Sequence, residues 1–401
     1  MKLIISVLLL FLTLQSFAQN DDLRKMIRFQ NKYKSYQLED LKEANYDSVV
    51  ILSIKNMNIK RVPKEVYKLK NLQYLDLSGN CLRRIPNRIK KLERLKILFV
   101  SQNKLKRISC GVTKLDSLFM FCANKNRIRS ISSNIDLLDQ LGTFELSNNN
   151  IRRLPSSLSN LENLTKLSLK SNRLNKLKID FSRLSNLVYL DVSKNRLSTL
   201  PKNIGNAYSL EVCEAWGNQL TQLPESFGEL LSLSKLLLHE NKFELFPVTV
   251  TKLNRLREVT FFHNNISYIP NEIGAMEYLN TLNLSKNKIS TIPDALTQLN
   301  YLDFLDLSEN KLKYFPKVLL RLSDLKSLDL KENKISKIPS DIDQMKSLRI
   351  LNLSETNIDK LPATLFEMLN LQYLYLDKDN FPTKVQEEIK KKKGEVYIYF
   401  K

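Results

Sequence analysis

The side chains best suited to acid–base chemistry or metal binding are the two histidines of the chain, His239 and His263, with the carboxylates of Glu214 and Glu240 nearby in sequence. Imidazole and carboxylate groups can ligate zinc or exchange protons near neutral pH. Their spacing matches no metal-ligand motif, and no serine or cysteine nucleophile is paired with them in a catalytic motif. The pattern favours surface histidines, so we predict no enzyme, no metal site and no cofactor.

The four cysteines are scattered through the chain rather than clustered: Cys81, Cys110, Cys122 and Cys213. Zinc sites and disulfide-stapled end caps need cysteines at close, regular spacings, which this sequence lacks. Cys213 occupies a position that leucine fills in other copies of a repeated phrase. We therefore predict that Cys213 is buried.

The elements that position these residues come from a 23-residue phrase that occurs fifteen times in a row without insertion or deletion. It reads L-x-x-L-x-L-x-x-N-x-L followed by x-x-I/L-P. A fixed period of this length is typical of a solenoid, in which each repeat packs on its neighbours and no second core is needed. The Asn position is held by Met57 at the start, by Thr356 and Asp379 at the end, and by asparagine in the twelve repeats between: Asn80, Asn103, Asn126, Asn149, Asn172, Asn195, Asn218, Asn241, Asn264, Asn287, Asn310 and Asn333.

Leucines three and five residues before the Asn position alternate with polar residues, as Leu75 and Leu77 do around Asp76. Alternation with a period of two predicts a strand whose leucines face inward, and repeats that run the same way give parallel strands. Proline in the return segment, as at Pro86, disfavours long helices and predicts short irregular or 3₁₀ turns. The asparagine is expected to be buried, because its amide can satisfy backbone groups that lose water.

These repeats resemble the leucine-rich repeat family over residues 49–381. The match is to the 23-residue class with the L/I-P step, found in secreted bacterial proteins and in eukaryotic Ras-binding and Scribble-type scaffolds. The resemblance implies an α/β solenoid, a horseshoe of fifteen repeats with a parallel β-sheet on its concave face and short irregular or 3₁₀ turns on its convex face. It implies ligand binding on the concave face and no reaction.

The first residues of the chain follow a different rule from the repeats. Lys2, an apolar run over 3–14, and the small residues Ser16 and Ala18 predict a secretory signal peptide over residues 1–18. The apolar run is shorter than the roughly 20 residues that a membrane span needs. No cysteine follows it closely enough to carry a lipid anchor. We therefore expect cleavage after Ala18, no transmembrane helix, and a secreted or periplasmic mature protein.

Segments on either side of the repeats are expected to cover the hydrophobic ends of the stack. Residues 19–48 are expected to form a helical N-terminal cap, because apolar residues recur on one helical face over 37–44. Residues 382–401 are expected to form a C-terminal cap, with a basic helix over 385–393 and a final strand over 395–401.

The outward strand position two residues before the Asn position is mostly serine, as a solvated surface would be. Three consecutive repeats carry Trp216, His239 and Phe262 there instead, and we name these three residues the aromatic ladder. Large rigid side chains on an outward face favour a docking site for a protein or peptide, although stacking between strands would explain them too. The predicted concave-face site comprises the ladder and its neighbours: Asp191, Glu214, Trp216, Leu237, His239, Thr260, Phe262 and His263.

Charge is segregated in this chain, whose lysines and arginines exceed its acids by 21. Two outward strand columns are nevertheless acidic. Asp191 with Glu214, and Asp306 with Asp329, are expected on adjacent strands. Such like-charged neighbours either favour a basic partner or are screened by solvent.

Basic residues recur three and four positions after the Asn position in the first six repeats. The constant period stacks them into one line, named here the basic stripe, which either attracts polyanions or only keeps the solenoid soluble. An anionic glycan or a membrane surface suits the expected compartment, whereas nucleic acid is not expected, because no aromatic residues interleave the stripe. The basic stripe comprises Lys60, Arg61, Arg83, Arg84, Lys106, Arg107, Arg129, Arg152, Arg153 and Lys176.

The sequence thus favours a non-enzymatic, extracytoplasmic protein–protein interaction module that binds a protein or peptide on its concave face. Two alternatives stay open. The first is an envelope-associated adhesin that binds anionic glycan or a membrane surface through the basic stripe. The second is a cytoplasmic signalling scaffold of the Ras or small-GTPase-binding type, which requires that the N-terminal segment is not a signal peptide.

Overall fold

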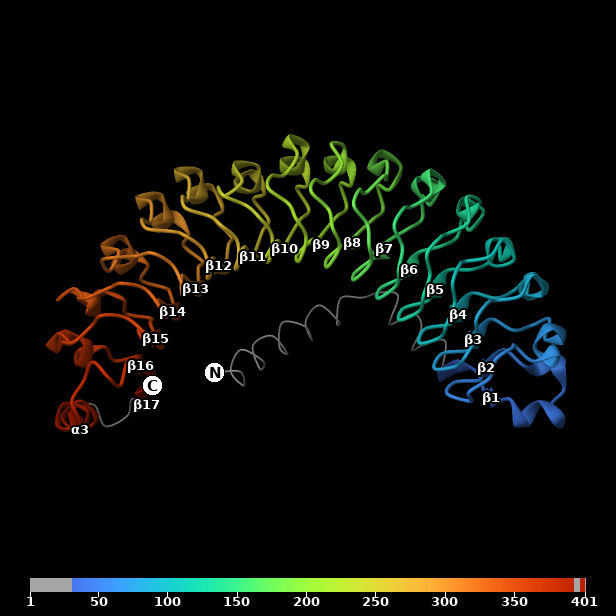
Figure 1. Ribbon diagram of the computed structural model, residues 1–401, viewed down its shortest axis with the longest axis horizontal. Coiled ribbons are helices and arrows are strands. Elements are labelled where there is room, and N and C mark those ends of the chain that lie inside the picture. Colours follow the sequence, from blue (N-terminus) through green and yellow to red (C-terminus); the bar gives the residue numbers. More distant parts are fainter. Residues whose placement is uncertain (1–30, 393–396, 401) are drawn as a thin grey trace. The chain divides into compact units, whose positions relative to one another are not determined.

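The computed structural model of the protein describes residues 31–392 and 397–400 (Figure 1). The predicted signal peptide over 1–18 lies outside the described residues. The chain divides after Asn172 into two compact units, which we describe one at a time. In both, a short strand and a short 3₁₀ turn alternate along the chain, as the sequence predicts.

The first unit contains strands β1 to β7, and each strand pairs in parallel with the next. The strands are β1 (Ser35–Gln37), β2 (Ile51–Ser53), β3 (Tyr74–Asp76), β4 (Ile97–Phe99), β5 (Met120–Cys122), β6 (Thr143–Glu145) and β7 (Lys166–Ser168). The 3₁₀ turns are η1 (Glu39–Lys42), η2 (Tyr46–Ser48), η3 (Lys64–Lys68), η4 (Asn87–Lys91), η5 (Val112–Lys114), η6 (Ile135–Leu137) and η7 (Ser156–Asn160).

The second unit repeats this plan with strands β8 to β17, again parallel and paired in chain order. The strands are β8 (Tyr189–Asp191), β9 (Val212–Glu214), β10 (Lys235–Leu237), β11 (Glu258–Thr260), β12 (Thr281–Asn283), β13 (Phe304–Asp306), β14 (Ser327–Asp329), β15 (Ile350–Asn352), β16 (Tyr373–Leu376) and β17 (Tyr397–Phe400). The 3₁₀ turns are η8 (Phe181–Arg183), η9 (Ile204–Asn206), η10 (Glu225–Glu229), η11 (Val248–Lys252), η12 (Asn271–Ala275), η13 (Asp294–Gln298), η14 (Lys317–Arg321), η15 (Ile342–Gln344) and η16 (Ala363–Glu367).

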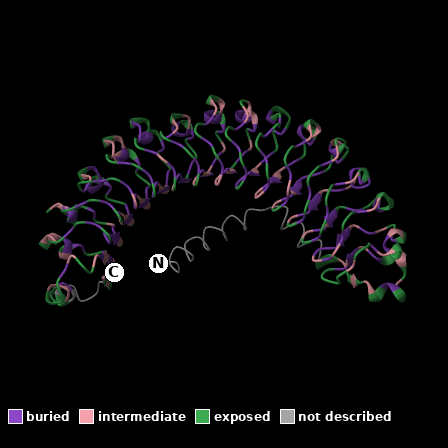
Figure 2. Ribbon diagram, viewed as in Figure 1, coloured by how far each residue is buried: buried purple, intermediate pink, exposed green. Residues whose placement is uncertain are grey.

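The strand register turns equivalent positions of successive repeats into straight columns. Cys213 pairs with Leu236, and Leu236 pairs with Val259, so that one inward position is repeated from strand to strand. These inward residues are fully buried, as Figure 2 shows for the interior of the repeats. Burial, with the charges of Glu214 and Asp191 nearby, raises the pKa of the Cys213 thiol to about 12. The predicted burial of Cys213 is confirmed.

The buried asparagines hold the repeats together through one hydrogen-bond pattern, which Asn241 illustrates. Its Nδ2 donates to the carbonyl of Ala215 in the preceding repeat and to the carbonyls of Leu238 and His239 in its own repeat, at 3.1, 3.0 and 3.3 Å. Its Oδ1 accepts the backbone N–H of Leu220 at 3.0 Å. One amide thus satisfies four backbone groups that have lost water, which is the physical reason for the repeated asparagine.

Substitutes at the last Asn positions make fewer of these bonds. Thr356 is buried, and its hydroxyl donates one hydrogen bond, to the carbonyl of Leu353 at 2.7 Å. The residue just before the Asn position adopts the left-handed conformation in every repeat from Met57 to Thr356, with φ of 56° at Gln102 and 64° at Gly217. Most repeats place a residue other than glycine there, and the turn imposes that conformation on it.

The two ends of the repeat array differ in how well their sequence predicts them. Of the helical cap expected over 19–48, residues 19–30 lie outside the described residues. Within 37–44, β1 ends at Gln37 and the short 3₁₀ helix η1 follows over Glu39–Lys42, so the helical stretch there is shorter and tighter than expected. At the other end, α3 (Thr383–Lys392) and β17 lie where a helix and a strand were predicted. In the described ranges, no helix has the length and apolar character to cross a bilayer.

Candidate functional site

The aromatic ladder lies on three neighbouring strands of the second unit. Trp216, His239 and Phe262 each follow the end of their strand, β9, β10 or β11, by two residues. The residues immediately before them, Ala215 and its equivalents, are fully buried, whereas the three ladder residues are half-buried. Alternation along an extended backbone therefore puts the ladder on the outward face of the strands, as predicted. We call this outward face of β8 to β16 the strand face.

The three rings of the ladder are stacked on one another. The centroids of the Trp216 and His239 rings are 4.8 Å apart with an interplanar angle of 19°. The His239 and Phe262 centroids are 4.1 Å apart at 11°. Face-to-face stacking leaves the ring edges directed outward, so the ladder is a narrow ridge rather than a flat platform. The rings therefore stabilise one another by stacking between strands, which the sequence allowed as an alternative, and they also form a half-buried ridge on the outward face.

Glu214 lies beside this ridge and is held in place by two donors. Tyr189 on β8 donates its hydroxyl to Oε1 of Glu214 at 3.0 Å, and Nε1 of Trp216 donates to Oε2 at 3.3 Å. A carboxylate accepts about four hydrogen bonds, so Glu214 keeps acceptor capacity. A half-buried, immobilised anion therefore stands next to an apolar ridge.

Polar contacts also hold the His239 and Trp216 rings of the ladder in place. Nδ1 of His239 and Oγ1 of Thr260 are 3.0 Å apart, which sets the orientation of the imidazole. Nζ of Lys194 lies 4.8 Å from the centroid of a Trp216 ring, in cation–π geometry. Leu237 is half-buried between Glu214 and Thr260 in the adjacent column, as the strand register requires.

Two residues of the predicted site are not available in the same way. Asp191 is only 3% exposed, and its Oδ1 accepts hydrogen bonds from the backbone and hydroxyl of Ser193, so it serves the turn after β8. His263 is exposed in the turn after Phe262, where its φ of 56° directs it away from the ladder's column. The structure thus brings Glu214, Leu237 and Thr260 together with the ladder. Asp191 is next to Glu214 in the strand register but is buried and bonded to its own turn, and His263 points away from the ladder.

Comparison with known proteins identifies the repeats. Models described as leucine rich repeat match residues 47–105, 186–207, 254–312 and 323–381. The structure of a leucine-rich repeat protein of Leptospira interrogans is 31% identical in sequence, over 92% of this chain and 100% of that chain, with a TM-score of 0.84. This chain belongs to the leucine-rich repeat family. No curated protein matches it in sequence.

Other leucine-rich repeat structures share the fold at lower identity. An internalin of Listeria monocytogenes is 23% identical over 84% of this chain and 92% of that chain, with a TM-score of 0.64. The ectodomain of a membrane receptor kinase of Arabidopsis thaliana, solved in complex with CASPARIAN STRIP INTEGRITY FACTOR 2, is 27% identical over 81% of this chain. This chain covers 43% of that ectodomain, with a TM-score of 0.61.

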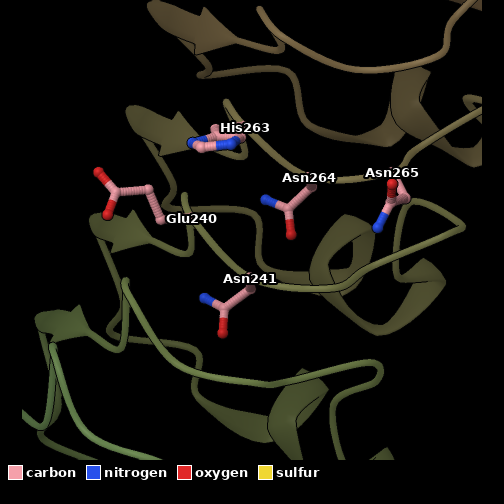
Figure 3. Close-up of a pocket in the computed structure, with 5 residues that line it drawn as sticks. All are labelled: Glu240, Asn241, His263, Asn264 and Asn265. Atoms are coloured by element: carbon pink, nitrogen blue, oxygen red, sulfur yellow. The ribbon is translucent and has the colours of Figure 1, made fainter.

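A small cavity of about 260 Å³ opens beside the turns of two leucine-rich repeats, lined by Glu240, Asn241, His263, Asn264 and Asn265. Figure 3 shows Glu240 and His263 on one side of this cavity and the asparagines on the other. Asn241 and Asn264 bind backbone carbonyls and are committed to the fold. Among the described residues, no group of three or more histidine, cysteine or acidic side chains is placed to hold a metal ion.

A pair of carboxylates lies farther along the strand face, where Asp306 on β13 is in register with Asp329 on β14. Asn283 donates to Asp306 at 3.1 Å from one side, and Asn352 donates to Asp329 at 2.9 Å from the other. Burial, followed by the charge of Asp306, raises the pKa of Asp329 to about 7. Burial also raises the pKa of Asp306. The like-charged neighbours expected from the sequence are therefore present and are costly to ionise together.

Sequence reasoning missed the contacts that surround the ladder. Tyr189 and Lys194 belong to the preceding repeat, and their bonds to Glu214 and Trp216 depend on side-chain torsions. Sequence reasoning also missed a groove of about 580 Å³ beside Tyr278 and Tyr301, whose rings stack with centroids 5.7 Å apart. An exposed tyrosine at the same place in two consecutive repeats was the available signal.

Proposed function

We propose that this leucine-rich repeat protein is a non-enzymatic protein-interaction module, which binds a protein or peptide on its strand face through the aromatic ladder. The observation that carries the proposal is the outward stack of Trp216, His239 and Phe262 beside the anchored carboxylate of Glu214. Aromatic residues next to a fixed charge are typical of the energetic centre of an interface. The Arabidopsis receptor ectodomain, solved with its bound factor, supports this use of a similar fold.

The chemistry of the site defines the partner it suits. Ring edges and Leu237 offer apolar area that is already ordered, so a ligand side chain can bury them at little entropic cost. Glu214 has acceptor capacity left and is partly desolvated, which strengthens a bond to an ammonium or guanidinium group. The favoured ligand is a segment with an apolar residue close to a lysine or arginine.

The compartment proposed for this activity is extracytoplasmic, with Gln19 as the first residue after signal cleavage. N-terminal sequencing of the protein recovered from its native cells tests this part directly. A mature chain that begins at Gln19 supports export. An uncleaved Met1 in a cytoplasmic fraction favours the signalling-scaffold alternative.

The ladder is tested by panning a random peptide library on the immobilised protein and measuring the affinity of the enriched peptides. We expect Trp216→Ala with Phe262→Ala to weaken binding by roughly tenfold to a hundredfold, because two central aromatic residues are lost. The matched control is Tyr278→Ala with Tyr301→Ala, which removes another stacked, exposed ring pair of the same unit. Equal affinity of the peptides for the ladder variant and the control would remove the proposal.

A further inference from the structure

The basic stripe is a second surface with its own chemistry. Nine of its ten residues belong to the first unit, and Lys176 belongs to the second. The nine lie three or four residues after the Asn position of consecutive repeats, in the segment between each Asn turn and the following 3₁₀ turn. All nine are exposed, so their charged groups are available to a partner.

The charge of the first unit is far more one-sided than that of the second. Residues 31–172 contain 27 lysines and arginines against 12 acids, a net charge of +15. Residues 173–401 contain 32 against 28, a net charge of +4. Solubility needs only a modest net charge, and the second unit already shows a modest one. Concentration of the excess in one unit therefore calls for a further explanation.

The described acidic residues of the first unit do not neutralise the basic stripe through ion pairs. The ion pair found in the described part of the first unit joins Lys166 to Glu145, on the strands at 2.7 Å. None of the nine stripe residues forms an ion pair with a described carboxylate. Their fields add along the column, which strengthens attraction for a partner that carries many negative charges.

The geometry of the stripe suits a chain-like partner. Neighbouring repeats are about 4.8 Å apart at the strands, so nine charges over five repeats give on the order of one positive charge per 2 to 3 Å. That density approaches the one negative charge per roughly 1.7 Å of duplex DNA. A membrane surface would favour exposed apolar anchors, but the large apolar side chains exposed in the described first unit are Met57 and Leu137, neither at a stripe position. Aromatic residues that could stack on nucleic-acid bases are absent from the stripe positions themselves.

We propose that the basic stripe of the first unit is a binding surface for a linear anionic polysaccharide, which lies along the column of arginines and lysines. Sulfate or carboxylate groups of the polymer meet successive repeats, and binding releases the counterions of both partners. This surface is separate from the aromatic ladder, so the protein holds a polymer through one unit and a peptide through the other.

The experiment compares two triple variants of the full chain that lose the same charge. One carries Arg84→Gln, Arg107→Gln and Arg153→Gln in the stripe. The other carries Lys313→Gln, Lys337→Gln and Lys360→Gln, which are exposed and three or four residues after the Asn position in the second unit. The probe is a heparin-derived dodecasaccharide, titrated by calorimetry at low and at physiological salt, with thermal melts to show that both variants fold.

We expect the stripe variant to lose affinity by about tenfold or more at low salt, with a shallower salt dependence, and the control by less than about threefold. Trp216 fluorescence should not respond to the oligosaccharide, which separates this surface from the ladder. Equal losses in both variants, or no measurable binding to the folded wild type, would overturn the proposal. Tighter binding to phosphatidylglycerol vesicles or to oligodeoxythymidylate at the same salt would overturn it in favour of a membrane or a nucleic acid.

Discussion

Asn241 and His239 are two residues apart in one repeat, and the structure gives them opposite surroundings. Asn241 is buried and bonded to four backbone groups, in a pattern that its equivalents share through most of the array. His239 lies on the strand face, in a column that is serine in many other repeats. The buried column repeats because the backbone sets the same demand in every repeat. The outward column is under no demand shared by every repeat, although serines such as Ser193 and Ser308 are buried and donate their hydroxyls to the aspartate two residues earlier. We propose that its departures from serine mark where a partner docks.

The first prediction tests the buried column by removing one of its asparagine amides. We expect Asn241→Ala to lower the free energy of unfolding by about 2 to 4 kcal/mol, because it leaves the Leu220 N–H buried without a partner and removes one donor from each of three carbonyls. Denaturant and thermal melts measure the change. The control is Asn254→Ala, an exposed asparagine of the next repeat, for which we expect less than about 0.5 kcal/mol. Equal effects at the two positions would contradict the account.

A smaller effect is expected on the outward face. Phe262→Ala removes a half-buried ring that stacks on His239, and we expect a loss of about 1 to 2 kcal/mol. A double-mutant cycle with His239→Ala isolates the stacking part, which should be about 0.5 to 1.5 kcal/mol. A coupling energy of zero would show that the rings are only neighbours and that the ridge is not a rigid unit.

The carboxylate pair on the strand face, Asp306 and Asp329, should make the stability of the protein depend on pH. Because the pKa of Asp329 is about 7 in the folded protein and near 4 in the unfolded chain, the folded state binds more protons between these values. Stability contributed by this group therefore falls as pH rises from about 4 to 7. Partial exposure of Asp329 weakens the effect, so Asp329→Asn should stabilise the protein at pH 8 by about 1 kcal/mol and flatten the thermal-melting profile. The exposed Asp324→Asn in the same repeat serves as control, and an unchanged profile in the Asp329 variant would refute the assignment.

The smallest effect on stability is expected at the residue between the outward position and the buried Asn position of a repeat. Gln102 has a φ of 56° and lies between the outward Ser101 and the buried Asn103. Glycine there relieves backbone strain but adds freedom to the unfolded chain, so Gln102→Gly should change stability by less than about 0.5 kcal/mol. Gln102→Val should cost about 1 kcal/mol or more, since a β-branched residue resists this conformation. Similar melting temperatures for the two variants would argue against a backbone demand at this position.

The sequence predicted those parts of the structure that depend on period alone. The parallel strands, the short turns, the buried asparagines and the outward position of Trp216, His239 and Phe262 all follow from a strict register. The helix before the first repeat was predicted less well in length and type, because a single segment such as residues 37–44 has no neighbouring copies to disclose its period.

The candidate site was only partly predictable for a related reason. The position of a residue in the repeat predicts which face of the sheet its side chain lies on. It does not predict the side-chain torsions, which decide the neighbour that the side chain contacts. Asp191 turns back to Ser193, and His263 leaves the ladder because its backbone is left-handed. Tyr189 reaches Glu214 across a strand. These outcomes depend on local hydrogen bonds that the repeat does not encode.

The central claim is that the ladder on β9 to β11 is where a partner docks. Trp216 is the one tryptophan of the chain, so its fluorescence reports on that site without interference. Titration of the wild-type protein with a peptide enriched by panning should change the emission of Trp216 along a saturable curve, with the same Kd that calorimetry gives. Calorimetric binding that leaves Trp216 emission unchanged, and that survives Trp216→Ala with Phe262→Ala, would contradict the account.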